Sequence, residues 1–213
     1  MVMDGLKKFF KKTFGNFFRN RKEIKMGFYG PPNAGKTSLV NRICKDFTGE
    51  ELGSVSKIPH ETRAVQFKEK VEISYKGKKL VFKVIDTPGI ATKIDYENFL
   101  KYRMKKGEAK DRAKEATQGV IEAIKWLDDM DMVVVVLDST ENPYNQVNIT
   151  IIGNLVARKI PVLVVANKVD LGKSDIKKIE AAFPEYEVVG ISAKYGKNLD
   201  EFYESIFKIS RRV

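Results

Sequence analysis

Apolar residues along this chain gather into short runs separated by amphipathic stretches. Runs of four to six residues rich in valine, isoleucine and phenylalanine predict buried strands at Ile24–Tyr29, Leu80–Ile85, Met132–Leu137, Val162–Ala166 and Val188–Ile191. Val65–Tyr75 instead alternates apolar and polar residues, and the turn-like stretch 76–79 would join it to Leu80 as a hairpin. Helical periodicity predicts helices at Lys36–Asp46, Asp111–Met130, Pro143–Lys159, Asp175–Phe183 and Leu199–Ile209.

The order of these elements predicts the fold class. Strands separated by helices form βαβ units, whose sheet is parallel and covered by helices on both faces. With the one antiparallel hairpin, we expect an α/β domain around a mainly parallel, six-stranded sheet. A chain of 213 residues with 43% apolar content suits one such domain, predicted at residues 23–213 after an N-terminal extension at 1–22.

Charge and cysteine content indicate which partners and which cellular compartment suit this chain. The net charge is +11, and residues 1–26 carry eight lysines and arginines against two acidic residues, which suggests an RNA or membrane partner for the N-terminus. A single cysteine, Cys44, excludes an internal disulfide and suits a reducing cytoplasm. No apolar run approaches the ~20 residues of a membrane span, and the N-terminus lacks the continuous apolar stretch of a signal peptide.

The stretch GPPNAGKTS at residues 30–38 lies between the first predicted strand and the first predicted helix, the context that a phosphate-binding P-loop requires. Backbone N–H groups of such a loop point at phosphate beside the positive end of the helix. Lys36 would reach the β- and γ-phosphates, and the Thr37 hydroxyl would bind Mg²⁺. The predicted nucleotide contacts in this loop are Gly30, Asn33, Ala34, Gly35, Lys36, Thr37 and Ser38.

Motifs follow three other predicted strands, one suited to Mg²⁺ and the γ-phosphate and two suited to guanine. Asp86 of DTPG can hold Mg²⁺ through water, and the Gly89 N–H can meet a γ-phosphate. Asp170 of NKVD can accept hydrogen bonds from both N1–H and the 2-amino group of guanine, donors that adenine does not present, while Lys168 can lie along the base. The Ala193 N–H of SAK can reach the guanine carbonyl. Base contacts are therefore predicted from Asn167, Lys168, Asp170, Ser192, Ala193 and Lys194.

With these motifs in this order, residues 24–210 resemble a GTPase of the Era-like (TrmE-Era) branch of the translation-factor-related P-loop GTPases. The family pattern P-N-x-G-K-S/T is matched by Pro32, Asn33, Gly35, Lys36 and Thr37. The stretch HETR resembles switch I of the family, which implies that Thr62 binds Mg²⁺ in the GTP state. The resemblance also implies a Ras-like fold, hydrolysis of GTP to GDP and phosphate, and a two-state switch.

An apolar residue, Ile90, follows DTPG where many GTPases carry a water-orienting glutamine. Era-like proteins resemble this chain in that respect and hydrolyse GTP nonetheless. In several of them the asparagine aligned with Asn33 helps to bind K⁺ against the phosphates, where a cation can neutralise developing charge. The resemblance therefore implies slow, cation-assisted hydrolysis with catalytic residues Asn33, Lys36, Thr62 and Gly89.

Two features depart from the family pattern. The given sequence stops at Val213, shortly after its last predicted helix, so we do not expect RNA binding through the C-terminal KH domain that Era carries. Residues 91–118 form an extended switch II region rich in lysine and arginine. This region fits either a solvated helix with ion pairs such as Glu108–Arg112 or a nucleotide-dependent effector surface.

The N-terminal stretch 6–20 predicts a basic amphipathic helix, with phenylalanines on one half and lysines and Arg19 on the other. Such a helix can pack on its own domain, lie in an anionic membrane surface, or dock on RNA or a protein. Two hypotheses for the output follow. One is a ribosome- or RNA-associated assembly GTPase, and the other is a recruitment switch peripheral on the membrane. Neither predicts an oligomeric state.

Overall fold

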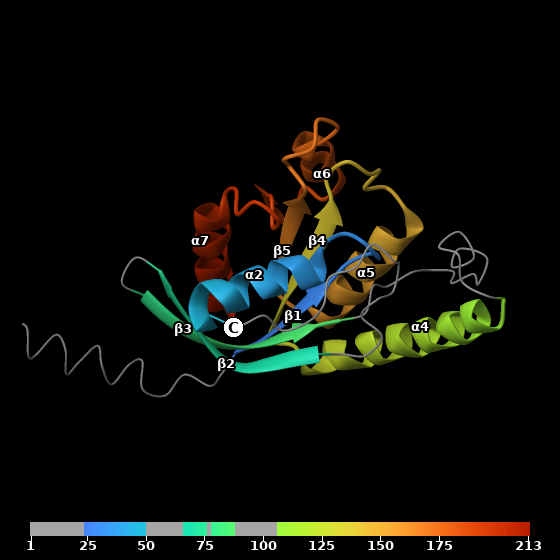
Figure 1. The fold of residues 1–213 in the computed structure, drawn as a ribbon. Coiled ribbons are helices and arrows are strands. Elements are labelled where there is room, and N and C mark those ends of the chain that lie inside the picture. The colour runs from blue at the N-terminus through green and yellow to red at the C-terminus, as the bar shows by residue number, and fades with distance from the viewer. Residues whose placement is uncertain (1–23, 50–65, 76–77, 88–105) are drawn as a thin grey trace, which may run out of the picture.

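A six-stranded sheet forms the middle layer of the protein (Figure 1). The computed structural model describes residues 24–49, 66–75, 78–87 and 106–213. The predicted N-terminal extension at 1–22 lies outside these residues, as do Thr62, Gly89 and Ile90. Statements about the fold below refer to the described ranges.

The described strands run in the order β2-β3-β1-β4-β5-β6, and among them only the β2–β3 pair is antiparallel. Their bounds are Ile24–Tyr29 for β1, Gln66–Tyr75 for β2, Lys78–Asp86 for β3, Met132–Asp138 for β4, Val162–Asn167 for β5 and Glu187–Ile191 for β6. The valine-rich strands β4 and β5 lie in the interior of the sheet with helices over both faces, which suits their continuous apolar sequence. The predicted Ras-like α/β fold is confirmed.

Within the described residues, five α-helices cover the sheet: α2 at Lys36–Thr48, α4 at Lys106–Trp126, α5 at Gln146–Arg158, α6 at Ile176–Ala182 and α7 at Leu199–Ile209. In the same ranges, two 3₁₀ turns follow helices, η1 at Leu127–Asp129 and η2 at Ser210–Arg212. Helix α5 begins later than the predicted Pro143, because the Asn145 side chain accepts a hydrogen bond from the Asn148 N–H and caps the first turn.

Helix α4 differs most from its prediction. It begins at Lys106 rather than Asp111, and it ends at Trp126 rather than Met130. Most residues of its first half are strong helix formers (Lys, Glu, Ala and Arg), but they form no apolar face, so hydrophobic periodicity misses it. Residues 106–118 of the predicted switch II extension therefore belong to this helix, with exposed side chains at Glu108, Asp111, Lys114 and Gln118.

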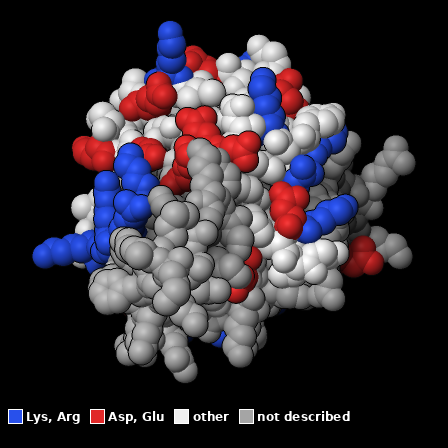
Figure 2. Space-filling view, turned by 90° about the vertical axis from the view of Figure 1, so that its left-hand side faces the viewer, with Lys and Arg blue, Asp and Glu red and all other residues white. Residues whose placement is uncertain are grey.

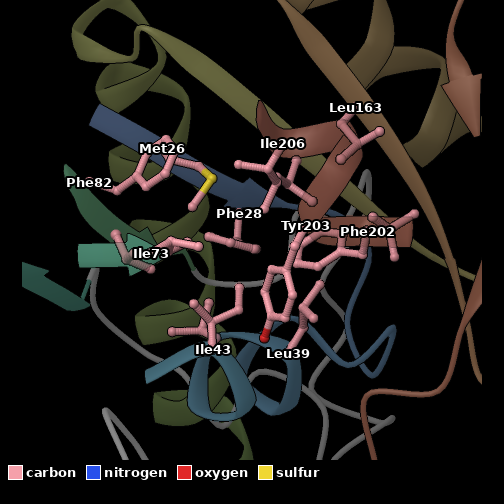
Figure 3. Packing of buried hydrophobic residues seen from close by; sticks show 14 of the residues in the cluster. Met26, Phe28, Leu39, Ile43, Ile73, Phe82, Leu163, Phe202, Tyr203 and Ile206 are labelled. Atoms are coloured by element: carbon pink, nitrogen blue, oxygen red, sulfur yellow. The ribbon is translucent and has the colours of Figure 1, made fainter. Parts of the chain in front are cut away.

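Two apolar layers hold the helices to the sheet. Helices α2 and α7 pack on one face around Met26, Phe28, Phe82, Phe202 and Ile206 (Figure 3). Helices α4, α5 and α6 contribute to the other layer, which includes Tyr29, Ile85, Ala123, Leu155 and Ile179. Alternation along β1 explains the division, since successive side chains of a strand point to opposite faces.

Surface charge on the described residues is mixed. Figure 2 shows basic and acidic side chains interspersed on one face, so the described part of that face is not a uniformly basic surface. Among the described helices, none combines the length and apolarity needed to cross a bilayer.

Candidate nucleotide-binding site

The predicted motifs meet at one edge of the sheet. The P-loop follows β1, Asp86 ends β3, Asn167 ends β5, and Ser192 follows β6. The carboxyl ends of these strands lie at the same edge because all four run parallel. In open α/β sheets this edge is where ligands bind.

Backbone geometry requires glycine at two P-loop positions. Gly30 has φ 153°, and a Cβ there would lie 2.1 Å from the carbonyl oxygen of Val136. Gly35 has φ 94°, and a Cβ there would lie 2.2 Å from Nδ2 of Asn167. Asn33 also has a positive φ, 61°, which asparagine adopts more readily than most residues. These conformations turn the loop into the N-terminus of α2.

The phosphate end of the site gathers Lys36, Thr37 and Asp86. The ammonium group of Lys36 donates hydrogen bonds to the carbonyl oxygens of Gly30 and Pro31, at 3.3 and 3.1 Å. The Thr37 hydroxyl donates to Oδ2 of Asp86 at 2.6 Å. One lysine, one hydroxyl and one carboxylate therefore lie beside the open N-terminus of a helix.

Burial shifts both charged groups toward their neutral forms. Burial lowers the pKa of Lys36 to about 8, although the nearby Asp86 charge acts in the opposite direction. Burial also raises the pKa of Asp86, against the hydrogen bond from Thr37 and the charge of Lys36. Both pKa shifts favour the neutral form of the group. The hydrogen bonds and charges of the protein itself therefore compensate these two buried charges only in part.

These residues fit Mg²⁺. Oδ1 of Asp86 is buried and has no hydrogen-bond partner, so the carboxylate keeps an acceptor in addition to the oxygen that receives the Thr37 proton. Within the described ranges, no three His, Cys, Asp or Glu side chains come together as a metal site. Mg²⁺ suits such a sparse set, because it keeps waters and takes its remaining ligands from substrate phosphates.

Asn167 connects three of the loops. Its Nδ2 donates to the carbonyl oxygen of Ala34 at 2.9 Å, and its Oδ1 accepts from the Ala193 N–H at 3.0 Å. The predicted guanine donor, the Ala193 N–H, thus already has a partner within the protein, and a guanine carbonyl would have to share it. The Ser192 hydroxyl accepts from the Tyr195 N–H at 3.2 Å and shapes the SAK turn rather than pointing outward.

The end of the site predicted to bind guanine contains two exposed charged residues and one lysine that forms an ion pair. Asp170 is exposed, as its predicted role requires. Lys168 has φ 70°, and its ammonium group lies 2.5 Å from Oδ2 of Asp138. Lys194 is exposed and lies over the Tyr195 ring, 4.9 Å from its centroid.

Sequence reasoning missed Asp138. Its carboxylate is partly buried, which opposes ionisation, but hydrogen bonds from Lys168 and Thr140 hold its pKa below the usual value. The signal available in the sequence was that Asp138 directly follows the predicted strand Met132–Leu137; its place between the P-loop strand and the NKVD strand came from the structure.

Residues 25–168 match the family described as 50S ribosome-binding GTPase. The chain is 27% identical to GTPase Der of Campylobacter hominis over 91% of this chain and 38% of that protein. It is 34% identical to GTPase Era of Clostridium botulinum over 87% of this chain and 56% of that protein. The chain therefore spans between about two fifths and just over half of the length of these relatives.

Two solved structures of Era also resemble this chain. A variant of Aquifex aeolicus Era bound to GDP and AlF4− superposes with a TM-score of 0.67 and 25% identity, covering 89% of this chain and 57% of that one. An Era complex with MgGDPNP and a fragment of 16S ribosomal RNA matches with the same TM-score, identity and coverage.

Proposed function

Because this chain belongs to the 50S ribosome-binding GTPase family, we propose that it binds GTP with Mg²⁺ and hydrolyses it to GDP and phosphate as a two-state switch. The observation that carries the proposal is the cluster of Lys36, Thr37 and Asp86 at the N-terminus of α2. On the same sheet edge, Asp170 follows β5 as the guanine acceptor.

Each side chain has a role in this proposal. Lys36 binds the β- and γ-phosphates, which replace the two carbonyl oxygens that it now contacts. Thr37 and Asp86 would hold Mg²⁺, and the ion would supply charge neutralisation on the phosphates. Asp170 accepts from the guanine edge. Thr62 and Gly89 are assigned to Mg²⁺ and the γ-phosphate by resemblance alone.

Potassium is the proposed second cation, with Asn33 as its ligand. Asn33 lies within the phosphate loop and is exposed, and its side-chain oxygen is the ligand assigned to the cation in this proposal. A monovalent cation there would offset charge that develops between the β- and γ-phosphates. Slow hydrolysis with Ile90 in place of glutamine suits a switch.

Nucleotide selectivity tests the biochemical part of the proposal. The purified chain should bind GTP and GDP tightly with Mg²⁺, bind ATP far more weakly, and release phosphate from GTP. Equal affinity for ATP and GTP would contradict the role of Asp170, and tight GTP binding without hydrolysis would reduce the protein to a binding module.

The partner proposed first is the ribosome or ribosomal RNA. The family description and the Era complex with 16S ribosomal RNA support it, as does the net charge of +11. Co-sedimentation with ribosomal subunits should be stronger in one nucleotide state than in the other. No co-sedimentation in either GTP or GDP would contradict it.

A membrane-surface switch is the second candidate, and the amphipathic pattern of residues 6–20 supports it. A cytoplasmic location, peripheral on the membrane in this second case, belongs to the same proposal. Flotation with anionic liposomes, run in parallel with the ribosome assay, separates the two candidates. Neither of these two candidate functions predicts an oligomeric state.

A further inference from the structure

Asp138 occupies the carboxyl end of β4, between the strand that leads into the P-loop and the strand that ends in NKVD. In the sheet register it lies opposite Asn167, the first residue of that motif. The segment that follows it is tied to the same region. The Ser139 N–H donates to the carbonyl oxygen of Asn167 at 2.9 Å, and the Asp175 N–H donates to that of Ser139 at 2.8 Å.

The Asp138 carboxylate is held from both sides. Its Oδ1 accepts hydrogen bonds from the backbone N–H and the hydroxyl of Thr140, at 3.0 and 2.7 Å. Its Oδ2 accepts from the ammonium group of Lys168 at 2.5 Å. The Asp138 side chain is only 14% exposed, so the carboxylate has little freedom to turn away.

Lys168 is constrained at both of its ends. Its backbone has φ 70°, a left-handed conformation, and its carbonyl oxygen accepts from the Leu171 N–H at 3.0 Å. The next residue, Val169, donates its N–H to the carbonyl oxygen of Ile191 at 3.1 Å. Because the backbone of Lys168 is fixed in this turn and its ammonium group is bonded to Asp138, the aliphatic stem between them is held at both ends.

From this geometry we propose that Asp138 is a positioning residue for the guanine base, acting through the ammonium group of Lys168. The inference rests on the proposed function, in which the Lys168 stem lies along the base. A lysine stem that is ordered before binding does not lose rotamer freedom when the base arrives. Thr140 supports the effect because it fixes the carboxylate that holds the lysine.

The competing explanation is that the pair only stabilises the fold. Ion pairs that are partly exposed to solvent contribute little to stability, and Lys168 is 30% exposed. The two explanations differ in what they predict for ligand binding, so the test measures nucleotide affinity and hydrolysis rate separately.

The experiment compares the full-length wild type with Asp138→Asn, Lys168→Met and the double variant. Methionine keeps an unbranched apolar side chain but removes the ammonium group. We expect Asp138→Asn to raise the Kd for MgGDP by about three- to tenfold, the range for losing one pre-ordered side chain. The single-turnover rate at saturating GTP should not change. In the Lys168→Met background, Asp138→Asn should add no further loss.

Two further variants serve as a control and as a second test of the inference. Asp129→Asn breaks a lysine–aspartate pair with Lys25 at 3.1 Å, at the opposite edge of the sheet, and should leave the Kd unchanged. Thr140→Val removes one donor to Asp138 while keeping side-chain shape, and should raise the Kd about twofold. This variant keeps the test informative if Asp138→Asn fails to fold.

An unchanged Kd in both Asp138→Asn and Thr140→Val would overturn the inference. So would an equal loss with and without the Lys168 ammonium group, because Asp138 would then act by another route. A wild type that binds MgGDP but does not hydrolyse GTP would contradict the proposed function alone, since the GDP comparison does not depend on hydrolysis.

Discussion

Two side chains at the sheet edge, Lys36 and Asp170, have opposite environments. Lys36 is buried beside Asp86, whereas Asp170 is exposed. Burial makes the charge of Lys36 costly until phosphates compensate it, while exposure leaves the Asp170 side chain accessible to a base. Each environment leads to a prediction that concerns one residue.

Asp170→Asn should shift base selectivity from guanine to xanthine. The carboxylate accepts two hydrogen bonds, but an amide offers one acceptor and one donor, which suits the xanthine edge better. Affinity for GDP should fall by at least tenfold, since a hydrogen bond to a charged group is lost. Competition between GDP and XDP measures the shift, and an unchanged preference for GDP would remove Asp170 from the base site.

Lys36→Met should stabilise the nucleotide-free protein near pH 7 while abolishing stabilisation by GTP. Burial lowers the pKa of Lys36 to about 8, below its value in the unfolded chain. Between these two pKa values the unfolded chain binds more protons, so wild-type stability should rise with pH above about 8. Below pH 8 the full cost of the buried charge remains, and methionine removes it.

Melting temperatures of both proteins at pH 7 and pH 10 check this prediction. The gain from Lys36→Met should be about 1–3 kcal/mol at pH 7 and should shrink at pH 10. A variant that is less stable than the wild type at both pH values would show that the two carbonyl contacts of Lys36 outweigh the cost of its buried charge.

At the scale of elements, the P-loop combines a backbone requirement with a proposed cation site. Asn33 has φ 61°, so alanine at this position would add strain to the loss of the side chain. Glycine removes the side chain and keeps the conformation. Hydrolysis by the wild type should be faster in K⁺ than in Na⁺ at equal ionic strength, and Asn33→Gly should abolish the difference.

Phosphate release in matched potassium and sodium buffers measures the effect. Asn33→Gly should retain the binding of MgGDP, because backbone N–H groups rather than this side chain hold the phosphates. Equal wild-type rates in the two salts would mean that the charge on the phosphates is neutralised by another group.

Helix α7 shows how an element contributes to stability. Ile206 is fully buried between this helix and the core shared with α2 and β1 (Figure 3). Ile206→Ala should destabilise the protein by about 2–5 kcal/mol, through lost transfer energy and the cavity that remains. Val156→Ala, at a position 57% exposed on α5, should change stability by less than about 0.5 kcal/mol. Urea unfolding midpoints compare the two, and equal effects would contradict the assigned core.

Elements were predictable where an apolar face defines them. Helix α7 was predicted with its observed bounds because its apolar residues recur along the whole helix. Helix α4 was predicted five residues too short at its start, because its first half is polar and gains helicity from intrinsic propensity and from continuity with the packed half.

At the scale of the whole molecule, we expect the phenylalanines of the N-terminal segment to be covered by lipid, by the domain or by a partner. Residues 6–20 contain five of them, each of which gains roughly 1.5–3 kcal/mol on burial. A chain that begins at Lys22 should remain folded, keep its affinity for GDP and lose binding to anionic liposomes if lipid is the cover. If the domain itself is the cover, this chain should melt at a lower temperature or aggregate.

Liposome flotation and thermal melting of the shortened and full-length chains distinguish these outcomes. Full-length protein that ignores anionic vesicles in both nucleotide states would remove the membrane candidate. Loss of ribosome co-sedimentation on shortening, with unchanged melting and flotation, would instead assign the segment to RNA or protein binding.

The sequence by itself determined the order of strands and helices and the four motifs, because hydrophobic runs and glycine-rich turns are local patterns. Only the tertiary structure decided how distant groups pair. Asn167 bonds to a residue 133 positions away, and Lys168 to one 30 positions away. The same packing gave Asp86 its unpaired buried oxygen and lowered the pKa of Lys36. Burial and through-space contact depend on which strands are neighbours, and that information is absent from any local stretch of the chain.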